Sequence, residues 1–315
     1  MGAVMRAVLP GWMQSRLEDR LPKWIDAAWW KDEAELIDLA PGAQIGWFDM
    51  HIKPPALNAL SKARDLEWLN SAYAGVDWMP LADLKARDIK LTCGSGLAAG
   101  QVAEFAVMSM VAFARGYREF VRAGDRREWL KRPPASREVA GSRALILGYG
   151  SIGQAAARML RAFDVECVPV RSTAGEAVLG PDEWRGRLGE FDWIVLTLPA
   201  TPETIGMIGA AEIAAMKSNA VVVNFGRAEV LNQPMLVEAL ENEAIGGAIL
   251  DLTTPEPLPS DHRLWSLENV RITMHLCGVP NKSSRARAAQ RFLDNCERFR
   301  TGQQLEGQVD LDRGY

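Results

Sequence analysis

The chain has 315 residues, of which 48% are hydrophobic, so its length favours two domains, each with its own core. Lys and Arg number 36 and Asp and Glu number 40, and a formal charge of −4 without a basic block argues against a nucleic-acid partner. No apolar stretch is long enough to span a bilayer, and four scattered cysteines indicate a reduced, cytoplasmic protein without a structural metal.

Short β-type runs alternate with helical patterns in the first part of the chain. Such alternation predicts a parallel sheet with helices on its faces. The expected strands are 5–10, 44–48, 66–71 and 89–93, and the expected helices between them are 14–21 and 57–63.

A long helical pattern follows, from near Leu97 to Gly124, with apolar residues around much of its surface. Such a helix is expected to be buried between domains or subunits. The polar, proline-containing stretch 124–141 has the composition of a connecting arm, and together the two features predict a symmetric homodimer. Trp129 and Trp265 are most simply packing residues, with a dimer contact or a pocket rim as the alternatives.

A second αβ series runs from Arg143 to about Thr273, and the chain ends in a helical pattern over 283–302. If that last helix packs on the first domain, the small domain is discontinuous. The predicted fold is therefore α/β, with two Rossmann-like domains, parallel sheets and a deep cleft between them. We expect a substrate-binding domain from 1–96 and 282–315, and a dinucleotide-binding domain with a dimerisation arm from 97–281.

A glycine-spaced turn, GYGSIG, joins a strand to a helix in the second series. Gly148 permits the tight turn, Gly150 lets the backbone approach a pyrophosphate, and Gly153 allows close helix–strand packing. The N-terminus of the following helix offers free N–H groups to phosphates. In this strand–turn–helix context the pattern predicts dinucleotide binding.

An arginine stands where an NAD-binding unit of this shape often has an acid. Arg171 lies eighteen residues after Gly153 (171 − 153), at the end of the second strand, whereas Glu166 lies at its beginning. A guanidinium suits the 2′-phosphate of NADP(H), with Ser172 or Thr173 adding a hydroxyl donor. We therefore expect NADP(H), with NAD(H) as the alternative if Arg171 only stacks on the adenine.

Three charged or titratable residues follow later strands of the same series. Arg227 comes after the apolar run 220–225, Glu256 lies in a proline-rich loop after Asp251, and His275 follows a short strand. Residues beyond the carboxyl ends of parallel strands line the ligand crevice of an open αβ sheet. A guanidinium can hold a carboxylate and polarise a ketone, an imidazole can move a proton, and a carboxylate can fix its tautomer. These groups suit the reduction of a 2-oxo acid.

Several motifs in order resemble those of the D-isomer-specific 2-hydroxyacid dehydrogenases, and particularly the NADPH-using glyoxylate/hydroxypyruvate reductases. They are AGVD (74–77), VAE (102–104), GYGSIG, LPATPET (198–204), NFGR (224–227), LDLTTPEPLP (250–259) and ITMHLCG (272–278). The resemblance implies that Arg227 binds the substrate carboxylate and carbonyl, that His275 donates or accepts the proton, and that Glu256 supports His275.

The resemblance also implies further contacts with cofactor and substrate. Asp251 matches the acid that contacts the nicotinamide carboxamide. The expected cofactor contacts besides the glycines, Arg171 and Asp251 are Ser151, Ile152, Pro199 and Phe225. The expected substrate contacts from the first domain are Gly75 and Val76, through backbone N–H groups, and Trp47, which with Phe48 resembles a substrate-side wall in a loop.

Four positions depart from the family pattern: Ala228 replaces a glycine, Asn232 an acid, Met274 a proline and Cys277 a small apolar residue. None removes a reacting group.

The sequence predicts an oxidoreductase that reduces a small 2-oxo acid of the glyoxylate or hydroxypyruvate type to the D-2-hydroxy acid, with hydride from NADPH and His275 as general acid/base. One alternative is an NAD-dependent formate- or phosphite-type dehydrogenase, which Arg171 disfavours. Another is a non-catalytic, nucleotide-sensing corepressor-like protein on the same fold.

Overall fold

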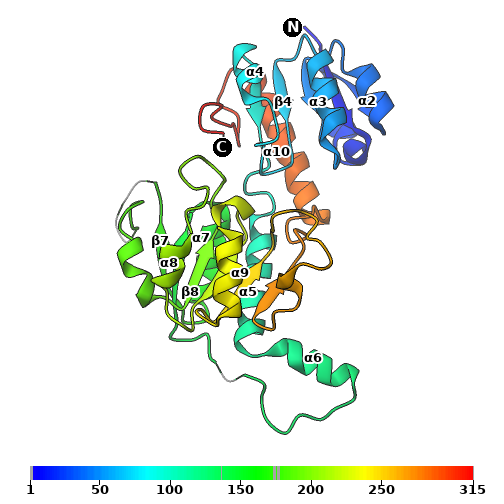
Figure 1. Ribbon diagram of the computed structural model, residues 1–315. Helices are drawn as coiled ribbons and strands as arrows, with labels where there is room; N and C mark the ends of the chain where they lie inside the picture. The colour runs from blue at the N-terminus through cyan, green and yellow to red at the C-terminus, as the bar shows by residue number, and fades with distance from the viewer. Residues whose placement is uncertain (1–2, 136, 173–174, 176–177, 315) are drawn as a thin grey trace. The chain divides into compact units, whose positions relative to one another are not determined.

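The computed structural model describes residues 3–135, 137–172, 175 and 178–314 (Figure 1). The chain divides into two units, Met1–Ala98 with Pro280–Tyr315, and Ala99–Val279. Both bounds lie within two residues of the division expected from the sequence. Among the described helices, none is both long and apolar enough to cross a bilayer.

The first unit is built on a five-stranded parallel sheet in the order β2-β1-β3-β4-β5. The strands are β1 (Met5–Pro10), β2 (Ile25–Trp30), β3 (Ile45–Trp47), β4 (Trp68–Asn70) and β5 (Lys90–Thr92). The helical segments are η1 (Gly11–Met13), α1 (Gln14–Leu17), η2 (Glu18–Arg20), α2 (Glu33–Leu39), α3 (Lys53–Lys62), α4 (Leu81–Ala86) and α10 (Lys282–Arg300).

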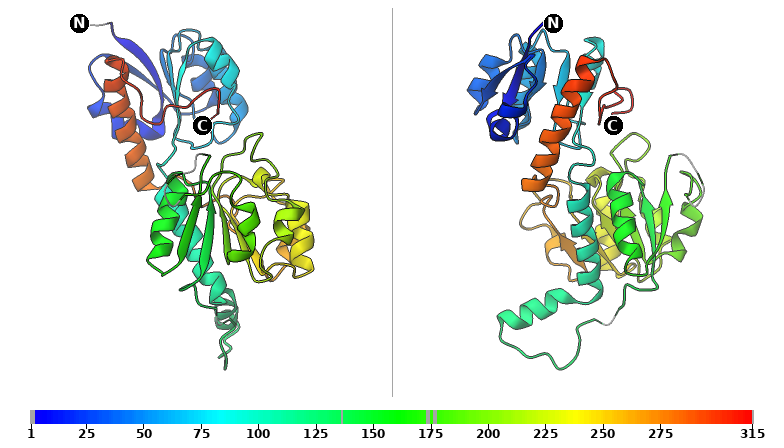
Figure 2. Two further views of the ribbon diagram at one scale, coloured as in Figure 1. Left: turned by 90° about the vertical axis from the view of Figure 1, so that its left-hand side faces the viewer. Right: turned by 180° about the vertical axis from the view of Figure 1, so that it is seen from behind.

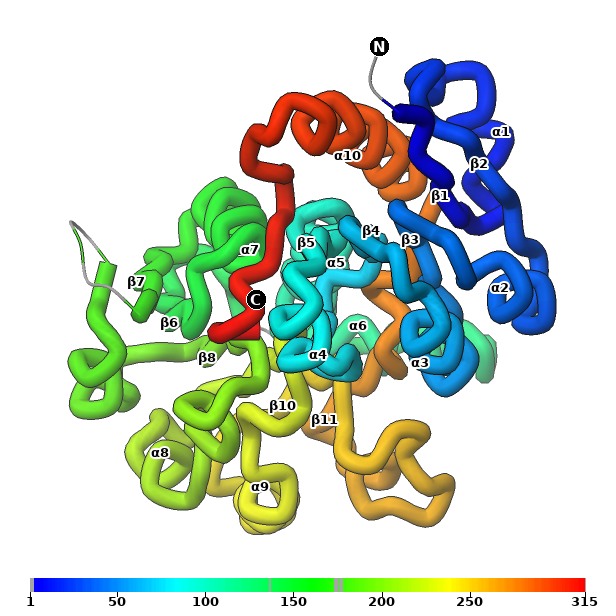
Figure 3. Tube along the Cα trace, turned by 90° about the horizontal axis from the view of Figure 1, so that it is seen from above, coloured from blue at the N-terminus to red at the C-terminus, as the bar shows by residue number. Residues whose placement is uncertain are grey.

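Successive residues of these strands point to opposite faces, and both faces are covered (Figure 3). Val8 and Leu69 pack with α2, α3 and α4 on one face. Ala7, Trp47 and Trp68 pack with α1 and α10 on the other. The C-terminal helix α10 thus completes the first unit, as the pattern over 283–302 suggested.

The second unit is built on a six-stranded parallel sheet in the order β11-β10-β9-β8-β6-β7. The strands are β6 (Arg143–Leu147), β7 (Glu166–Val170), β8 (Trp193–Leu196), β9 (Val221–Asn224), β10 (Gly247–Leu250) and β11 (Val270–Ile272). The helical segments are α5 (Ala99–Ala114), α6 (Tyr117–Asp125), α7 (Ser151–Arg161), η3 (Arg185–Glu190), α8 (Ala210–Ala214), η4 (Ala228–Val230), α9 (Gln233–Glu241) and η5 (Arg263–Trp265).

The central strands β8, β9 and β10 are buried along their whole length, as the continuous apolar runs in the sequence indicate. Within this unit α5 and α7 cover one side of the sheet, while α8 and α9 cover the other (Figure 2). The α/β class and the two parallel sheets confirm the predicted fold class.

The prediction of one helix from Leu97 to Gly124 is wrong. The structure has two helices, α5 and α6, because Gly116 takes φ 62° in the left-handed region and ends the first helical path. The pattern over 14–21 is also only partly α-helical, since it continues as the 3₁₀ segment η2.

Candidate active site

The glycine turn joins β6 to α7, next to β8, where the strand order of the second unit reverses direction. Gly148 has φ 94°, and a Cβ on Gly153 would lie 2.2 Å from the carbonyl oxygen of Gly148. Both glycines are therefore required by the backbone itself. A Cβ on Gly150, in contrast, would meet nothing within 4 Å. The open space above Gly150 and the N-terminus of α7 form a cradle that fits a pyrophosphate.

Arg171 lies directly after β7 and is exposed. Its Nε and Nη2 donate to the carbonyl oxygen of Tyr149, at 3.1 and 2.8 Å, and the guanidinium lies 5.5 Å from the Tyr149 ring centroid. The cation is thus fixed against the glycine turn, with other N–H donors remaining. Ser172 is exposed beside it, whereas Thr173 lies outside the described residues.

Arg227 is half-buried in the turn between β9 and η4. The fully buried Asn224 shapes this turn, because its Oδ1 accepts from the Gly226 N–H at 3.0 Å and its Nδ2 donates to the Arg227 carbonyl at 2.9 Å. The Arg227 guanidinium donates to the Gly226 carbonyl at 2.8 Å. We did not single out Asn224 from the sequence, although a polar residue closing an apolar strand was a usable signal.

His275 and Glu256 are in direct contact. The Nδ1 atom of His275 lies 2.8 Å from Oε2 of Glu256, and the Glu256 Oε1 accepts from the Thr253 backbone N–H at 3.1 Å. Since a carboxylate only accepts, Nδ1 of His275 carries the hydrogen and Nε2 is directed elsewhere. Both side chains are partly exposed, so a ligand can reach the imidazole.

Asp251 holds the segment that carries His275. The buried carboxylate accepts from Oγ1 of Thr273 at 2.6 Å, and the Asp251 backbone carbonyl accepts from the His275 N–H at 2.6 Å. The neighbouring Cys277 is fully buried, which raises the pKa of its thiol to about 12. That thiol is therefore not a nucleophile near neutral pH.

Arg227, Asp251 and His275 follow β9, β10 and β11, which are neighbours in the sheet. The carboxyl ends of parallel strands lie at one edge, so these residues belong to the same ligand edge of the second unit. Phe225 is buried beside Arg227, while Pro199 follows β8 with its carbonyl accepting from Oγ1 of Thr204 at 2.7 Å. At the glycine turn, Ser151 is exposed and Ile152 is half-buried, both in the first turn of α7.

Two departures from the family pattern have structural reasons. Met274 and His275 have φ 58° and 55°, and proline, locked near −65°, cannot take the conformation of Met274. Asn232 is the N-cap of α9, where its side chain accepts from the Met235 N–H at 3.3 Å. Nothing in the structure explains Ala228.

The first unit corrects one predicted site residue. Trp47 ends β3 rather than lying in a loop, and its indole and the Phe48 ring are both buried, on opposite faces of the sheet. A fully buried indole cannot form a wall for a ligand. The run QIGWF has apolar residues on both faces of the strand. It therefore lacks the alternating pattern that would have shown which side of each aromatic residue is buried.

The indole of Trp47 instead forms a hydrogen bond with Asp49, the residue that follows Phe48. Its Nε1 donates at 2.8 Å to Asp49, which also accepts from Oγ of Ser71 at 2.7 Å and from the Ala72 N–H at 2.5 Å. Burial raises the pKa of the Asp49 carboxyl, against the lowering effect of these hydrogen bonds. Asp49 thereby fixes the start of the loop 71–79, which contains Gly75 and Val76. The backbone position of Gly75 is half-buried, and Val76 packs into the core.

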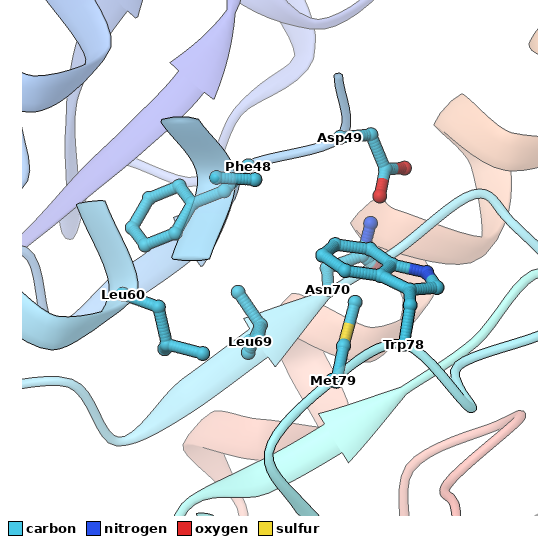
Figure 4. Close-up of a pocket in the computed structure, with 8 residues that line it drawn as sticks. Phe48, Asp49, Leu60, Leu69, Asn70, Trp78 and Met79 are labelled. Carbon is cyan, nitrogen blue, oxygen red and sulfur yellow. The ribbon is translucent and has the colours of Figure 1, made fainter. Parts of the chain in front are cut away.

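Two cavities adjoin Asp49. The cavity in Figure 4, between Phe48 and Trp78, has a volume of about 10 Å³ and is barely large enough for one water molecule. The other has a volume of about 440 Å³, which lies in the range of about 300–1,000 Å³ typical of pockets for organic ligands. Its lining includes Trp12, Trp30, His51, Tyr73 and Arg285, all from the first unit.

Comparisons with known proteins agree with this geometry. The family model for the D-isomer specific 2-hydroxyacid dehydrogenase NAD-binding domain matches residues 107–277. The chain is 29% identical over 315 residues to glyoxylate/hydroxypyruvate reductase A of Citrobacter koseri, covering 92% of this chain and 97% of the relative.

Two solved structures are similar along nearly the whole chain. One is a D-isomer specific 2-hydroxyacid dehydrogenase family protein of Aeromonas salmonicida, with a TM-score of 0.86 and 29% identity over 98% of this chain and 100% of that chain. The other is the NADPH-dependent glyoxylate/hydroxypyruvate reductase of Sinorhizobium meliloti in complex with NADP and sulfate, with a TM-score of 0.82 and 25% identity over 99% and 100% of the two chains. With its glycine turn, its His275–Glu256 pair and its motifs in the family order, the chain belongs to the D-isomer specific 2-hydroxyacid dehydrogenase family.

Proposed function

We propose that the protein reduces small 2-oxo acids of the glyoxylate or hydroxypyruvate type to D-2-hydroxy acids, with NADPH as the preferred cofactor. The observation that carries this proposal is the contact of 2.8 Å between His275 Nδ1 and Glu256, which holds the imidazole with Nε2 available to a ligand. A nucleotide-sensing protein without catalysis has no chemical need for an oriented proton donor of this kind.

The residues of this chain fit the cofactor, and other residues bind the substrate and transfer the proton. The glycine turn and the N-terminus of α7 receive the pyrophosphate, and the bound nicotinamide supplies the hydride. Arg227 holds the substrate carboxylate and withdraws charge from the carbonyl oxygen. His275 delivers a proton from Nε2 to that oxygen, while Glu256 stabilises the imidazolium and keeps its orientation.

Arg171 favours NADPH over NADH in this proposal. Its guanidinium is fixed at the end of β7, where the adenosine ribose of a bound dinucleotide lies in folds of this type. The similar Sinorhizobium meliloti reductase is described as NADPH-dependent and was solved with NADP.

We also propose that the protein is a homodimer that associates through the second unit. Large apolar side chains are exposed on α5, α6 and the arm, and Trp129 is 95% exposed. Within that unit, α6 and the segment after it extend away from the sheet (Figure 1). An apolar surface of this kind favours a protein partner, and a second copy is the commonest one.

Steady-state kinetics test the reaction directly. Glyoxylate, hydroxypyruvate, pyruvate and phenylpyruvate are each measured with NADPH and with NADH. We expect turnover of the smaller acids with NADPH. His275→Asn should lower kcat by about 10²–10⁴-fold, because the general acid is lost. Arg227→Ala should lower kcat/KM for every acid in the panel.

A second histidine provides the matched control. His262 lies in a loop and its Nδ1 accepts from the Leu264 N–H at 3.2 Å, so His262→Asn should retain activity. Full turnover by His275→Asn would contradict the assignment. Tight NADPH binding without turnover of any 2-oxo acid would favour the non-catalytic alternative.

A further inference from the structure

The pocket of about 440 Å³ in the first unit lies where the topology of its sheet favours a ligand. From β1 the chain passes to β2 on one side and later to β3 on the other, so the connections diverge between β1 and β3. Ligands bind outside the carboxyl ends of strands at such a switch point. Trp12 follows β1, and Asp49 and His51 follow β3, and all three line the pocket.

Arg285 contributes a cation to this pocket from the first turns of α10. Its guanidinium lies 5.6 Å from the centroid of the Trp12 ring, within the range of a cation–π contact. Trp12 is itself held edge-on against the buried Trp47, with 5.7 Å between ring centroids. The cation therefore rests on an aromatic support that continues into the core.

The guanidinium of Arg285 forms no hydrogen bond or ion pair with the residues that the structure describes. Other arginines of α10 do have such partners: Arg287 donates to the Leu97 carbonyl at 2.9 Å, and Arg291 pairs with Glu306 at 3.0 Å. Among the described residues no ion pair joins Arg285 to Asp49, whose oxygens accept from Trp47, Ser71 and Ala72. An oriented cation without a carboxylate partner at a pocket wall is suited to an anionic ligand group.

We propose that Arg285 is a specificity-determining residue that selects 2-oxo acids carrying a second anionic group, a carboxylate or a phosphate, remote from the keto acid. This inference rests on the proposed function, because it concerns the selectivity of the same reaction among 2-oxo acids. The loop 71–79 starts at the pocket with Ala72 and Tyr73 and continues to Gly75 and Val76. A substrate bound at that loop can therefore extend toward Arg285 within one unit.

The test compares selectivity between charged and uncharged substrates. kcat/KM is measured for pyruvate, oxaloacetate, 2-oxoglutarate and 3-phosphohydroxypyruvate. Oxaloacetate and 2-oxoglutarate carry a second carboxylate, whereas 3-phosphohydroxypyruvate carries a phosphate, so the panel distinguishes the two kinds of anionic group. In the wild type, at least one dianionic acid should exceed pyruvate. In Arg285→Ala, the ratio of kcat/KM for that acid to kcat/KM for pyruvate should fall about tenfold to a hundredfold, because a charge-assisted hydrogen bond is lost.

Arg300 provides a control on the same helix. Its guanidinium also lies over an indole, 5.3 Å from the Trp24 ring, but it does not line the pocket. Arg300→Ala should leave the selectivity ratio unchanged. An unchanged ratio in Arg285→Ala, an equal loss in Arg300→Ala, or a wild type that prefers pyruvate to all three dianionic acids would overturn the proposal.

Binding of succinate by the full chain separates this inference from the proposed reaction. Calorimetry should show that succinate binds more tightly than acetate, and that Arg285→Ala removes the difference. If that result is obtained while no 2-oxo acid is turned over, the proposed reaction fails and the anion-selective role of Arg285 stands. If 2-oxo acids are turned over and succinate binds no more tightly than acetate, the role of Arg285 fails and the reaction stands.

Discussion

Arg171 shows how one side chain can depend on a loop for its position. Two of its N–H groups are used by the Tyr149 carbonyl within the glycine turn, so the guanidinium is fixed before any ligand arrives. Fixing the side chain in advance lowers the entropy that binding must overcome. Its selectivity for a phosphate is therefore expected to be large for one exposed residue.

Arg171→Ala should lower the ratio of kcat/KM with NADPH to kcat/KM with NADH about tenfold to a hundredfold, since hydrogen bonds to charged groups contribute about 1.5–3 kcal/mol. Arg158 is exposed on α7 and serves as the control, because Arg158→Ala removes the same charge from the same unit. A wild type that prefers NADH, or a ratio that does not change in Arg171→Ala, would rule out this role.

At this scale the sequence predicted where polar residues lie relative to the strands better than it predicted how deeply side chains are buried. The place of Arg171 at a strand end followed from its spacing after the glycines, and the positions of Arg227 and His275 followed from apolar runs that end abruptly. The support that Asp49 gives to the loop 71–79 depends on contacts between separate segments. Such contacts leave no periodic pattern in a sequence, so they became visible only in the fold.

The turn between β6 and α7 separates two roles of glycine. A Cβ on Gly153 would collide with the Gly148 backbone, whereas a Cβ on Gly150 would project into open space. Gly150 has φ −78°, which any residue can adopt. Gly153 is thus required by the fold, whereas we propose that Gly150 leaves room for the bound cofactor.

Alanine substitutions distinguish these roles. Gly153→Ala should destabilise the protein by about 1–3 kcal/mol, because backbone atoms at the contact cannot move away cheaply. Gly150→Ala should keep the wild-type Tm and raise KM for the cofactor. Thermal unfolding and cofactor titration of both variants provide the measurement. Equal losses of Tm in the two variants would show that Gly150 is also structural.

Among the elements, the strands of the second unit were the most predictable, because the runs that become β8, β9 and β10 are short, apolar and separated by polar turns. β2 was not anticipated, although Ile25–Trp30 pairs with β1 along its full length. It lies at the edge of the sheet and is only half-buried, so its residues lack the strict pattern of a central strand.

Taken as a whole, the molecule has two units in which polar residues follow the carboxyl ends of parallel strands. In the second unit these residues are Arg227 and His275, and in the first they are Asp49 and His51, which line a pocket together with Arg285 of α10. The helical pattern over 283–302 predicted a first domain that is discontinuous in sequence if this helix packs on it. The packing of α10 on the first sheet, through residues such as Phe292, gives the physical reason.

At the scale of the whole molecule, we expect two copies of the protein to form a dimer. Sedimentation velocity of the wild type at micromolar concentration should show a dimer, and Phe120→Asp on α6 should weaken it at least about tenfold by placing a charge in an apolar contact. Ile205 is exposed elsewhere in the second unit, so Ile205→Asp is the control. A monomeric wild type, or equal weakening by both variants, would contradict association through α6.

The indole of Trp47 contacts both Phe292 in the hydrophobic interior and Trp12 at the wall of the larger pocket of the first unit. It lies 5.3 Å from Phe292 of α10 and 5.7 Å from Trp12, as measured between ring centroids. A smaller side chain at Phe292 would let these packed rings shift, and the wall of the pocket at Trp12 would shift with them. Changes in substrate range can therefore arise in this protein from mutations in the hydrophobic interior, without any replacement among the residues that a substrate touches.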